Sequence, residues 1–328
     1  MSPPATPRVS RRRRWARRGA AVAVPVALGA FAATFAACPL PAPPAYEGSL
    51  PPAAPPSSMR VYAIPTGVTK RSAGFGYRGG SLFEARDFAM TAVLVRHPKG
   101  DLLIDTGLGR DIDARVGAMP WWFRAVTRYV RGRSTAEQLD AAGYDRRRLR
   151  AVLLTHAHWD HAAGLGELAD TPVWVTAEER RFVDEGGWTM DFVRGIDGVR
   201  WETYAFEGGP YLGFPKSHDV YGDGAIVVVP APGHTPGSVI VFLATPSGAR
   251  LALVGDLVWQ REGILEREER PWLMRSLGDQ DARAVRGGIL KMAALASRFP
   301  EMTLVPAHDT RGFAAMEPLP VRLDEPNP

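Results

Sequence analysis

Short apolar runs alternate along the chain with glycine- and proline-rich turns and with stretches of helical periodicity, from about residue 60 onward. Short runs rich in Val, Ile and Leu predict β-strands, and runs that are apolar throughout are typical of strands covered on both faces. The strands expected in the first half are Val61–Ile64, Thr91–Arg96, Asp101–Ile104, Ala151–Thr155 and Val173–Thr176. Those expected in the second half are Ile226–Pro230, Val239–Ala244, Leu251–Val254 and Thr303–Val305.

Helices are predicted between these strands. Ser134 with Glu137, and Thr176 with Glu179, have the spacing of a capping box, which marks the first turn of a helix. A third helix is expected near Gln280–Arg298, where apolar residues repeat on one face at helical spacing. That face consists of Ala282, Val285, Ile289, Met292 and Leu295.

Two aromatic-rich segments, residues 111–133 and 185–224, interrupt the alternation and are interpreted as additions to a scaffold. Large rigid rings can line a wide apolar pocket for an acyl chain or an aromatic ester. They can equally cover the scaffold or face a membrane. The residues considered for a pocket wall are Trp121, Trp122, Phe123, Trp188, Trp201 and Phe214.

The amino-terminal residues 1–38 have the order of an export signal: seven arginines between residues 8 and 18, then no charge from Gly19 to Ala37. Phe35-Ala36-Ala37 before the lone Cys38 resembles a bacterial lipobox, which predicts a lipid on Cys38 and attachment to a membrane. A simple cleaved signal, giving a secreted or periplasmic protein, and an uncleaved anchor are the alternatives. Residues 39–58, rich in Pro and Ala, are interpreted as a semi-extended linker to a domain at 59–328.

Composition narrows the possible chemistry. A single Cys excludes a disulfide framework and a Cys-rich metal site, so function must come from His, carboxylates or hydroxyls. The net charge of +5 comes from 40 Lys and Arg against 35 Asp and Glu. Without the seven amino-terminal arginines the balance is 33 against 35, or −2, which disfavours a nucleic-acid partner. Nothing in the sequence sets the oligomeric state.

The densest chemical signal is the segment Thr155-His156-Ala157-His158-Trp159-Asp160-His161, which follows an apolar run. It places three of the chain's seven histidines and one carboxylate at a predicted strand end. Imidazole nitrogens and carboxylate oxygens are ordinary ligands of zinc and its neighbours. Four such groups are too many for one ion that keeps an open position, so the segment suggests two ions.

Further candidate ligands follow other predicted strands. His234 lies in the turn Pro232–Ser238, Asp256 follows the run that ends at Gly255, and His308 follows Leu304–Ala307. Each alone is compatible with an ordinary turn or surface residue. Their recurrence at strand ends favours a shared site.

The ordered motifs THAHWDH, PGHTPGS, Gly255-Asp256 and PAHD at His308 resemble those of the metallo-β-lactamase superfamily over about residues 59–309. The resemblance implies an α/β fold, a four-layer αββα sandwich with a dinuclear metal centre at one edge. It also implies that Asp105 supports a ligand from behind. The implied ligands are His156, His158 and His234 for one ion and Asp160, His161 and His308 for the other, with Asp256 bridging.

The same resemblance implies a metal-dependent hydrolase in which two divalent ions acidify a water and polarise a carbonyl. Zinc is the expected metal, while iron, manganese or cobalt also suits the ligand set. Asp160 or a bound water would carry the proton. The expected reaction is cleavage of a carboxylic ester, lactone or thioester with an apolar portion. A phosphodiesterase or nuclease, a β-lactam hydrolase, and a redox or non-catalytic member of the fold are the alternatives.

The bridging Asp256 resembles glyoxalase II and the N-acyl homoserine lactonases more than the true β-lactamases. Quorum-quenching lactonases place a Tyr three residues after this Asp to contact the substrate carbonyl, and here that position is Trp259. An indole N–H can donate a hydrogen bond but has no hydroxyl. Trp259 therefore joins the candidate pocket residues Trp121, Trp122, Phe123 and Trp188.

Other motifs are weak. The glycine spacing of Gly74–Gly79 matches a dinucleotide fingerprint, but no helical pattern opens at its end, so a loop near the site mouth is expected. His97 and His218 have no motif around them and are expected at the surface.

Overall fold

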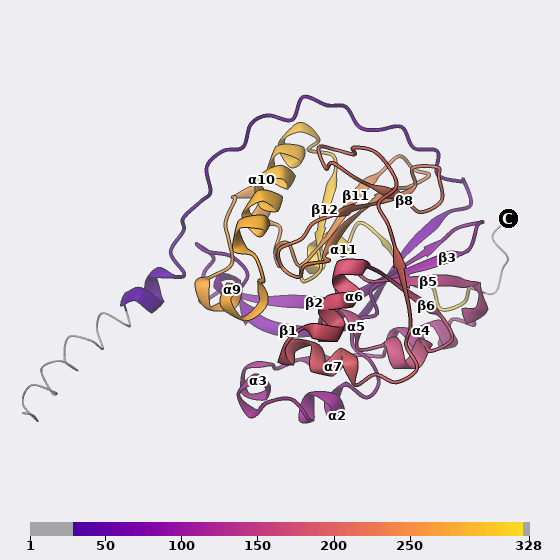
Figure 1. The fold of residues 1–328 in the computed structure, drawn as a ribbon, viewed down its shortest axis with the longest axis horizontal. Helices are drawn as coiled ribbons and strands as arrows, with labels where there is room; N and C mark the ends of the chain where they lie inside the picture. The colour runs from indigo at the N-terminus through magenta and orange to yellow at the C-terminus, as the bar shows by residue number, and fades with distance from the viewer. Residues whose placement is uncertain (1–28, 324–328) are drawn as a thin grey trace, which may run out of the picture.

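The structure, a computed structural model, describes residues 29–323. Two β-sheets lie face to face and helices cover the outer face of each, so the layers run helix, sheet, sheet, helix (Figure 1). This confirms the predicted αββα sandwich. Residues 1–28, which hold most of the proposed export signal, lie outside the described residues. Among the described residues, none belongs to a helix that is both long and apolar enough to cross a bilayer.

The first sheet has the strand order β13-β1-β2-β3-β5-β6-β7, with β4 paired to β1. The pairings β3–β5, β5–β6 and β6–β7 are parallel, so the carboxyl ends of these strands share one edge. Its strands are β1 (Arg60–Ser72), β2 (Ala85–Arg96), β3 (Asp101–Ile104), β4 (Val130–Arg131), β5 (Leu149–Leu153), β6 (Pro172–Thr176), β7 (Arg200–Tyr204) and β13 (Glu317–Pro318).

The second sheet has the order β12-β11-β10-β9-β8. The pairing β11–β12 is parallel and the others are antiparallel. Its strands are β8 (His218–Asp219), β9 (Ile226–Pro230), β10 (Val239–Ala244), β11 (Arg250–Gly255) and β12 (Thr303–Pro306).

The helices that cover the sheets differ in length, and α10 is the longest of those described. The α-helices are α2 (Ile112–Gly117), α3 (Trp121–Val126), α4 (Thr135–Ala141), α5 (Trp159–Ala162), α6 (Ala177–Glu185), α7 (Asp191–Arg194), α8 (Glu262–Leu265), α9 (Trp272–Gly278), α10 (Ala282–Arg298) and α11 (Thr310–Phe313). Four 3₁₀ turns are η1 (Ala73–Phe75), η2 (Arg146–Arg148), η3 (Leu165–Leu168) and η4 (Trp188–Met190).

Strand alternation divides the apolar side chains among three cores. In β10, Val239 and Val241 face the other sheet, whereas Ile240 and Phe242 face α10. In β3, Leu102 and Ile104 likewise point between the sheets. Because neighbouring residues of a strand point to opposite faces, runs that are apolar throughout fill two cores at once.

Two predicted elements are longer in the structure. β1 and β2 extend well beyond Val61–Ile64 and Thr91–Arg96 and pair over most of their length, with a register shift between Pro65 and Gly67. The added residues are partly polar and exposed, so they carry no continuous apolar signal.

The linker at residues 39–58 has no helix or strand, as expected, but it packs along the domain (Figure 1). Leu40, Tyr46 and Leu50 lie against the core beneath α10, and the Tyr46 ring meets Phe299 at 5.9 Å between centroids. The Arg267 carbonyl accepts a 2.8 Å bond from the Leu40 N–H. A few apolar side chains in this Pro-rich segment therefore suffice to hold the linker against the domain.

His97 also differs from expectation. It is buried, its ring stacks on Tyr221 at 3.8 Å between centroids, and its Nε2 lies 3.0 Å from Asp223 Oδ2. The surface prediction was wrong because a carboxylate and an aromatic ring far along the chain satisfy the imidazole. His218 is half-buried beside Tyr204.

Candidate metal centre

The candidate ligands lie just after β5, β9, β11 and β12, at one edge of the sandwich. Asp160 and His161 belong to the short helix α5 and the others to loops. Strands that end together deliver their loops to the same place, so segments far apart in sequence meet there. The structure brings all seven predicted ligands into three overlapping groups. These groups are His156, His158 and His234; His156, His161 and Asp256; and Asp160, His161 and His308, with ligand atoms within 4.8 Å of one another in each.

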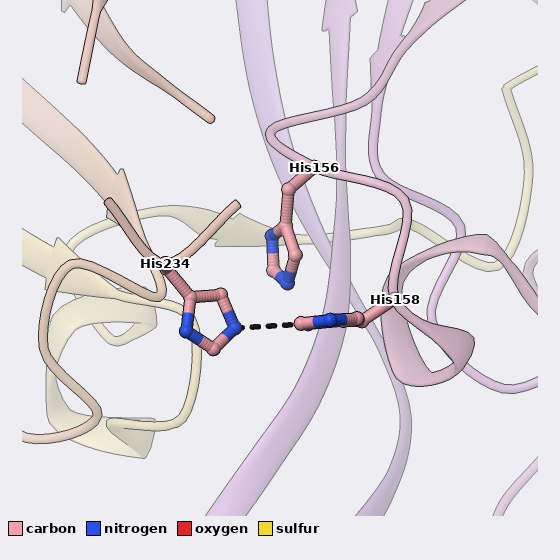
Figure 2. Close-up of side chains that lie close together, drawn as sticks. All are labelled: His156, His158 and His234. Atoms are coloured by element: carbon pink, nitrogen blue, oxygen red, sulfur yellow. Dashed lines mark hydrogen bonds between the residues drawn. The ribbon is translucent and has the colours of Figure 1, made fainter. Parts of the chain in front are cut away.

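The first group consists of three buried imidazoles that point toward a common centre (Figure 2). His156 and His158 come from the loop after β5, and His234 comes from the loop after β9. His158 Nδ1 lies 2.9 Å from His234 Nε2.

Asp256 lies between His234 of the first group and the pair His161 and His308. Its Oδ1 is 3.3 Å from His161 Nε2 and 3.2 Å from His308 Nε2. Its Oδ2 is 3.4 Å from His234 Nε2. Asp160 completes the far side, with Oδ2 3.4 Å from His308 Nε2. One carboxylate therefore faces both groups of imidazoles with different oxygens.

Three of these imidazoles are oriented from behind by an acceptor for Nδ1. When Nδ1–H donates to that acceptor, the neutral ring keeps a lone pair on Nε2, which faces Asp256. The acceptors are Asp279 Oδ1 for His234 at 2.9 Å, Asp105 Oδ2 for His161 at 2.8 Å and the Ala89 carbonyl for His308 at 2.7 Å. Asp105 thus lies behind His161, and the supporting role implied for it stays a prediction.

Several atoms in the cluster are buried without a hydrogen-bond partner: Nε2 of His156, His158 and His161, and Oδ1 of Asp256. Buried polar atoms are normally paired, so such a concentration at one point requires a further partner. A cation that accepts lone pairs from nitrogen and oxygen satisfies this requirement. The His/Asp cluster therefore fits divalent metal ions.

The protonation states also suit a metal. Burial lowers the pKa of His156 and His158 well below that of a free imidazole, and the neighbouring rings lower it further. Burial by itself would raise the pKa of Asp256, but His308 and His161 hold it well below its usual range. His156, His158 and Asp256 are therefore already in the neutral and ionised forms that bind cations. Burial would lower the pKa of His161 and His308, but Asp105 and Asp256 raise it for His161 and Asp256 raises it for His308, so a cation must displace a proton from each of these two rings.

A cavity of about 450 Å³ opens directly above the cluster. Its floor includes His158, Asp160, His234, Asp256 and His308. Its apolar wall consists of Phe75, Phe88, Met90, Met119, Trp122, Phe123, Trp159, Trp188, Trp259, Leu273, Met274 and Leu277.

The two aromatic segments meet in this wall. The Trp188 ring from η4 lies 4.7 Å from Trp122 and 5.6 Å from Phe123 of α3, both edge to face. Trp121 does not line the cavity: its side chain is 74% exposed, because the helical turn directs consecutive residues to different sides. Trp201 and Phe214 also lie outside it.

Trp259 lines the cavity, but its N–H is already engaged. The indole Nε1–H donates a 2.8 Å hydrogen bond to Asp256 Oδ2. The ring also lies under Arg270, whose guanidinium carbon is 5.1 Å from a ring centroid of Trp259. A ring with its one donor used on Asp256 does not offer that donor to a substrate carbonyl, contrary to the role implied by the lactonase Tyr.

Two supporting carboxylates were missed. Glu179 was interpreted only as part of a capping box, and Thr176 does accept from the Glu179 N–H. The carboxylate of Glu179, however, turns inward. It accepts from Ala157 N–H at 2.7 Å, from Thr235 Oγ1–H at 2.6 Å and from Gly237 N–H at 3.1 Å. These donors belong to the two loops that carry His156, His158 and His234.

Asp279, at the end of α9, is the second. It accepts from His234 Nδ1–H and from the buried Arg270, whose Nη1 donates to the Asp256 carbonyl at 2.6 Å. No local pattern in the sequence distinguishes Asp279 from an ordinary helix-end residue.

Known proteins resemble this chain in sequence. A sequence profile of the metallo-beta-lactamase superfamily matches residues 86–308. A probable metallo-hydrolase of Mycobacterium tuberculosis is 30% identical over 234 residues, covering 66% of this chain and 73% of that protein. The N-acyl homoserine lactonase AttM of Agrobacterium fabrum is 24% identical over 238 residues, covering 69% and 84%.

Solved structures agree in fold. An N-acyl homoserine lactone hydrolase with N-hexanoyl-L-homoserine at its catalytic metal centre gives a TM-score of 0.61 at 16% identity, covering 79% of this chain and 96% of that one. The dizinc quorum-quenching lactonase AidC gives 0.54 at 15% identity, covering 77% and 90%. With the profile match and the His/Asp cluster together, this chain belongs to the metallo-β-lactamase superfamily and is a metal-dependent hydrolase.

Proposed function

We propose that this protein hydrolyses a carboxylic ester, lactone or thioester whose acyl part is apolar. The observation that carries the proposal is that candidate metal ligands and an aromatic wall line one cavity. A long acyl chain would bury apolar surface against Trp122, Phe123 and Trp188 while its carbonyl lies at the floor. Relatives named as N-acyl homoserine lactonases support the same class of substrate.

The seven side chains would hold two divalent ions, and zinc is the proposed metal. When bound, such a pair supplies an acidified water and a Lewis acid for a carbonyl oxygen. We assign His156, His158 and His234 to one ion and Asp160, His161 and His308 to the other, with Asp256 shared.

Asp160 is the proposed proton carrier. It lines the cavity, so its carboxylate reaches the space in which a scissile bond would lie. It would take the proton that the attacking water loses and return it to the leaving oxygen or sulfur. A bond forms between the water oxygen and the acyl carbon, and the bond from that carbon to the leaving atom breaks, giving an acid and an alcohol or thiol.

The test is a hydrolysis screen of the purified, metal-analysed protein against lactones and thioesters of increasing acyl length. We expect kcat/KM to rise with acyl length, because each added methylene contributes about 0.8 kcal/mol when buried. Phosphodiesters and β-lactams are the comparison substrates. Turnover of either of these, with none on carboxylic esters, would contradict the proposal.

We also propose that the protein is exported and attached to a membrane through a lipid on Cys38. Cys38 is exposed, and its backbone N–H donates to both carboxylate oxygens of the buried Glu268, at 2.8 and 3.1 Å. Cys38→Ser should move the protein from the membrane fraction to the soluble fraction. Unchanged fractionation would instead favour an uncleaved anchor or simple secretion.

A further inference from the structure

Exposed apolar side chains gather around the mouth of the cavity. Nine large hydrophobic side chains are exposed among residues 29–323. Phe83 is 99% exposed, so the protein leaves its ring almost without cover, and Trp272 is 62% exposed. Six of the nine form what we call the mouth rim: Phe31, Leu82, Phe83, Trp121, Trp272 and Leu277. Processing at Cys38 would remove Phe31 and leave the other five.

Covalent neighbours and contacts connect the helical part of the rim to the cavity. Leu277 lines the cavity itself, and Trp272 directly precedes Leu273, which also lines it. Both belong to α9. Trp121 directly precedes the lining residue Trp122 in α3, and α3 and α9 lie on the same side of the molecule (Figure 1).

The remaining rim residues are linked to the cavity through the turn that holds Phe75, another residue of the cavity wall. The Ser81 carbonyl accepts from the Gly74 N–H at 3.0 Å, which holds the loop with Leu82 and Phe83 against η1. The Phe35 ring meets Phe75 at 5.5 Å and Phe31 at 5.4 Å between centroids.

The amino-terminal segment reaches the domain at this same rim. Thr34 Oγ1 accepts from the Trp272 N–H at 2.5 Å, and the Ala36 carbonyl accepts from Arg78 Nε at 2.9 Å. Cys38 is bound to Glu268, four residues before Trp272. The bond from Cys38 to Glu268 remains when the residues before Cys38 are removed, so either a lipid on Cys38 or an uncleaved apolar segment would hold a bilayer beside the rim.

We propose that the mouth rim docks on a lipid bilayer, so that the cavity opens toward the membrane and takes acyl substrates that reside there. The substrate part of this inference rests on the proposed ester or lactone hydrolysis. Aromatic and leucine side chains insert at the level of lipid headgroups, and basic residues beside them attract anionic headgroups. Exposed Arg124 and Arg128 supply such charges next to α3.

Site-specific labels test the orientation independently of catalysis. In a full-length Cys38→Ser background, Phe83→Cys and, separately, Val321→Cys would carry an environment-sensitive dye. Because this background lacks the lipid, the vesicles are supplied in excess, so that the weaker affinity of the rim itself populates the bound state. Val321 is a matched control, because it is 88% exposed, does not line the cavity and lies two residues before Leu323, whose N–H donates to the Ala142 carbonyl at the end of α4. With phosphatidylcholine–phosphatidylglycerol vesicles, the label at 83 should shift to an apolar signal and become shielded from an aqueous quencher, and the label at 321 should not.

Three outcomes would overturn the proposal. The first is vesicle binding with both labels in water, which would mean that the amino-terminal segment alone holds the protein. The second is an equal shift at both positions, and the third is a shift at 83 that grows with protein concentration without vesicles. That last result would identify a second copy of the chain as the occupant.

A kinetic comparison tests the substrate part. Phe83→Ser combined with Trp272→Ser leaves the cavity lining untouched, and Val321→Ser is the control. The double variant should keep its kcat/KM on a dissolved short-chain ester and lose about tenfold or more on a long-chain ester embedded in vesicles. If the double variant matched the Val321→Ser control on the dissolved ester and on the vesicle-embedded ester alike, delivery of substrate from lipid would be refuted. No hydrolysis of any ester would refute the proposed function and leave the labelling result standing by itself.

Discussion

The orientation of each imidazole in the cluster depends on the atom that accepts from its Nδ1. His234 illustrates this, because Asp279 holds its ring while the same carboxylate neutralises Arg270, both deep in the protein. The resulting Nε2 lone pair is fixed before any metal arrives. Affinity for the metal should therefore depend on residues that never contact it.

Asp279→Asn should weaken metal binding by about 10- to 100-fold, because an amide neither carries the charge that makes His234 more basic nor neutralises Arg270. Competition with a chromophoric chelator would measure the change. Asp281→Asn is the matched control: Asp281 caps α10 only two residues away, and Asn caps as well as Asp. Equal affinities in the two variants would remove Asp279 from the supporting role.

Substitutions at Trp259 separate its hydrogen bond to Asp256 from a contact with the substrate carbonyl. Trp259→Tyr and Trp259→Phe both remove the N–H that reaches Asp256, but only the first adds a hydroxyl. If this position can contact a substrate carbonyl, Trp259→Tyr should exceed Trp259→Phe by about tenfold in kcat/KM on N-acyl homoserine lactones. Indistinguishable rates would show that the hydroxyl does not reach the carbonyl.

Helix α6 acts as a brace between loops. Its buried Glu179 accepts three hydrogen bonds from the loops after β5 and β9, which carry the first group of imidazoles. Burial raises the pKa of Glu179, while the bonds from Thr235, Ala157 and Gly237 oppose that rise. The geometry of His156, His158 and His234 therefore rests on an element that supplies no ligand.

Glu179→Gln should lower the free energy of unfolding by about 2 kcal/mol, because an amide turns N–H donors toward other donors. Metal affinity should fall with it. Chemical denaturation and metal titration would measure both effects. Glu178→Gln, one residue earlier and exposed on the same helix, should change neither. A stable Glu179→Gln protein with full metal affinity would refute the bracing role.

In the molecule as a whole, the regions that stabilise the fold differ from the region that carries the candidate chemistry. Its three apolar cores lie between the sheets and beneath the helices, whereas the polar cluster occupies one edge. Most of the buried apolar area is therefore independent of the metal. The protein should remain folded when the site is damaged.

His158→Ala should reduce turnover by about a thousandfold or more, since metal activation supplies several kcal/mol, and should reduce the bound metal. The far-ultraviolet circular dichroism should stay close to that of the wild type. His218→Ala, in β8 and away from the cluster, controls for loss of an imidazole. Full activity of His158→Ala after chelator treatment would contradict a metal-dependent reaction.

Local sequence patterns determine the layers and the candidate ligands. Apolar runs such as Asp101–Ile104, Ile226–Pro230 and Val239–Ala244 match the observed strands to the residue, because strand pairing needs the burial that those side chains supply. The His/Asp motif places its ligands within one loop, so it is visible without a structure. The shared edge of the sandwich then brings in His234, Asp256 and His308.

Long-range contacts determine the rest. Asp279 and His234 are 45 positions apart and Glu179 and Thr235 are 56 apart, so no periodicity links them. Packing alone turns Trp121 to solvent, commits the Trp259 N–H to Asp256, buries His97 and holds the linker against α10. Such features depend on which surfaces come into contact when the two sheets pack together. Each hydrogen bond also requires a particular distance and angle, and the type of residue alone does not specify these.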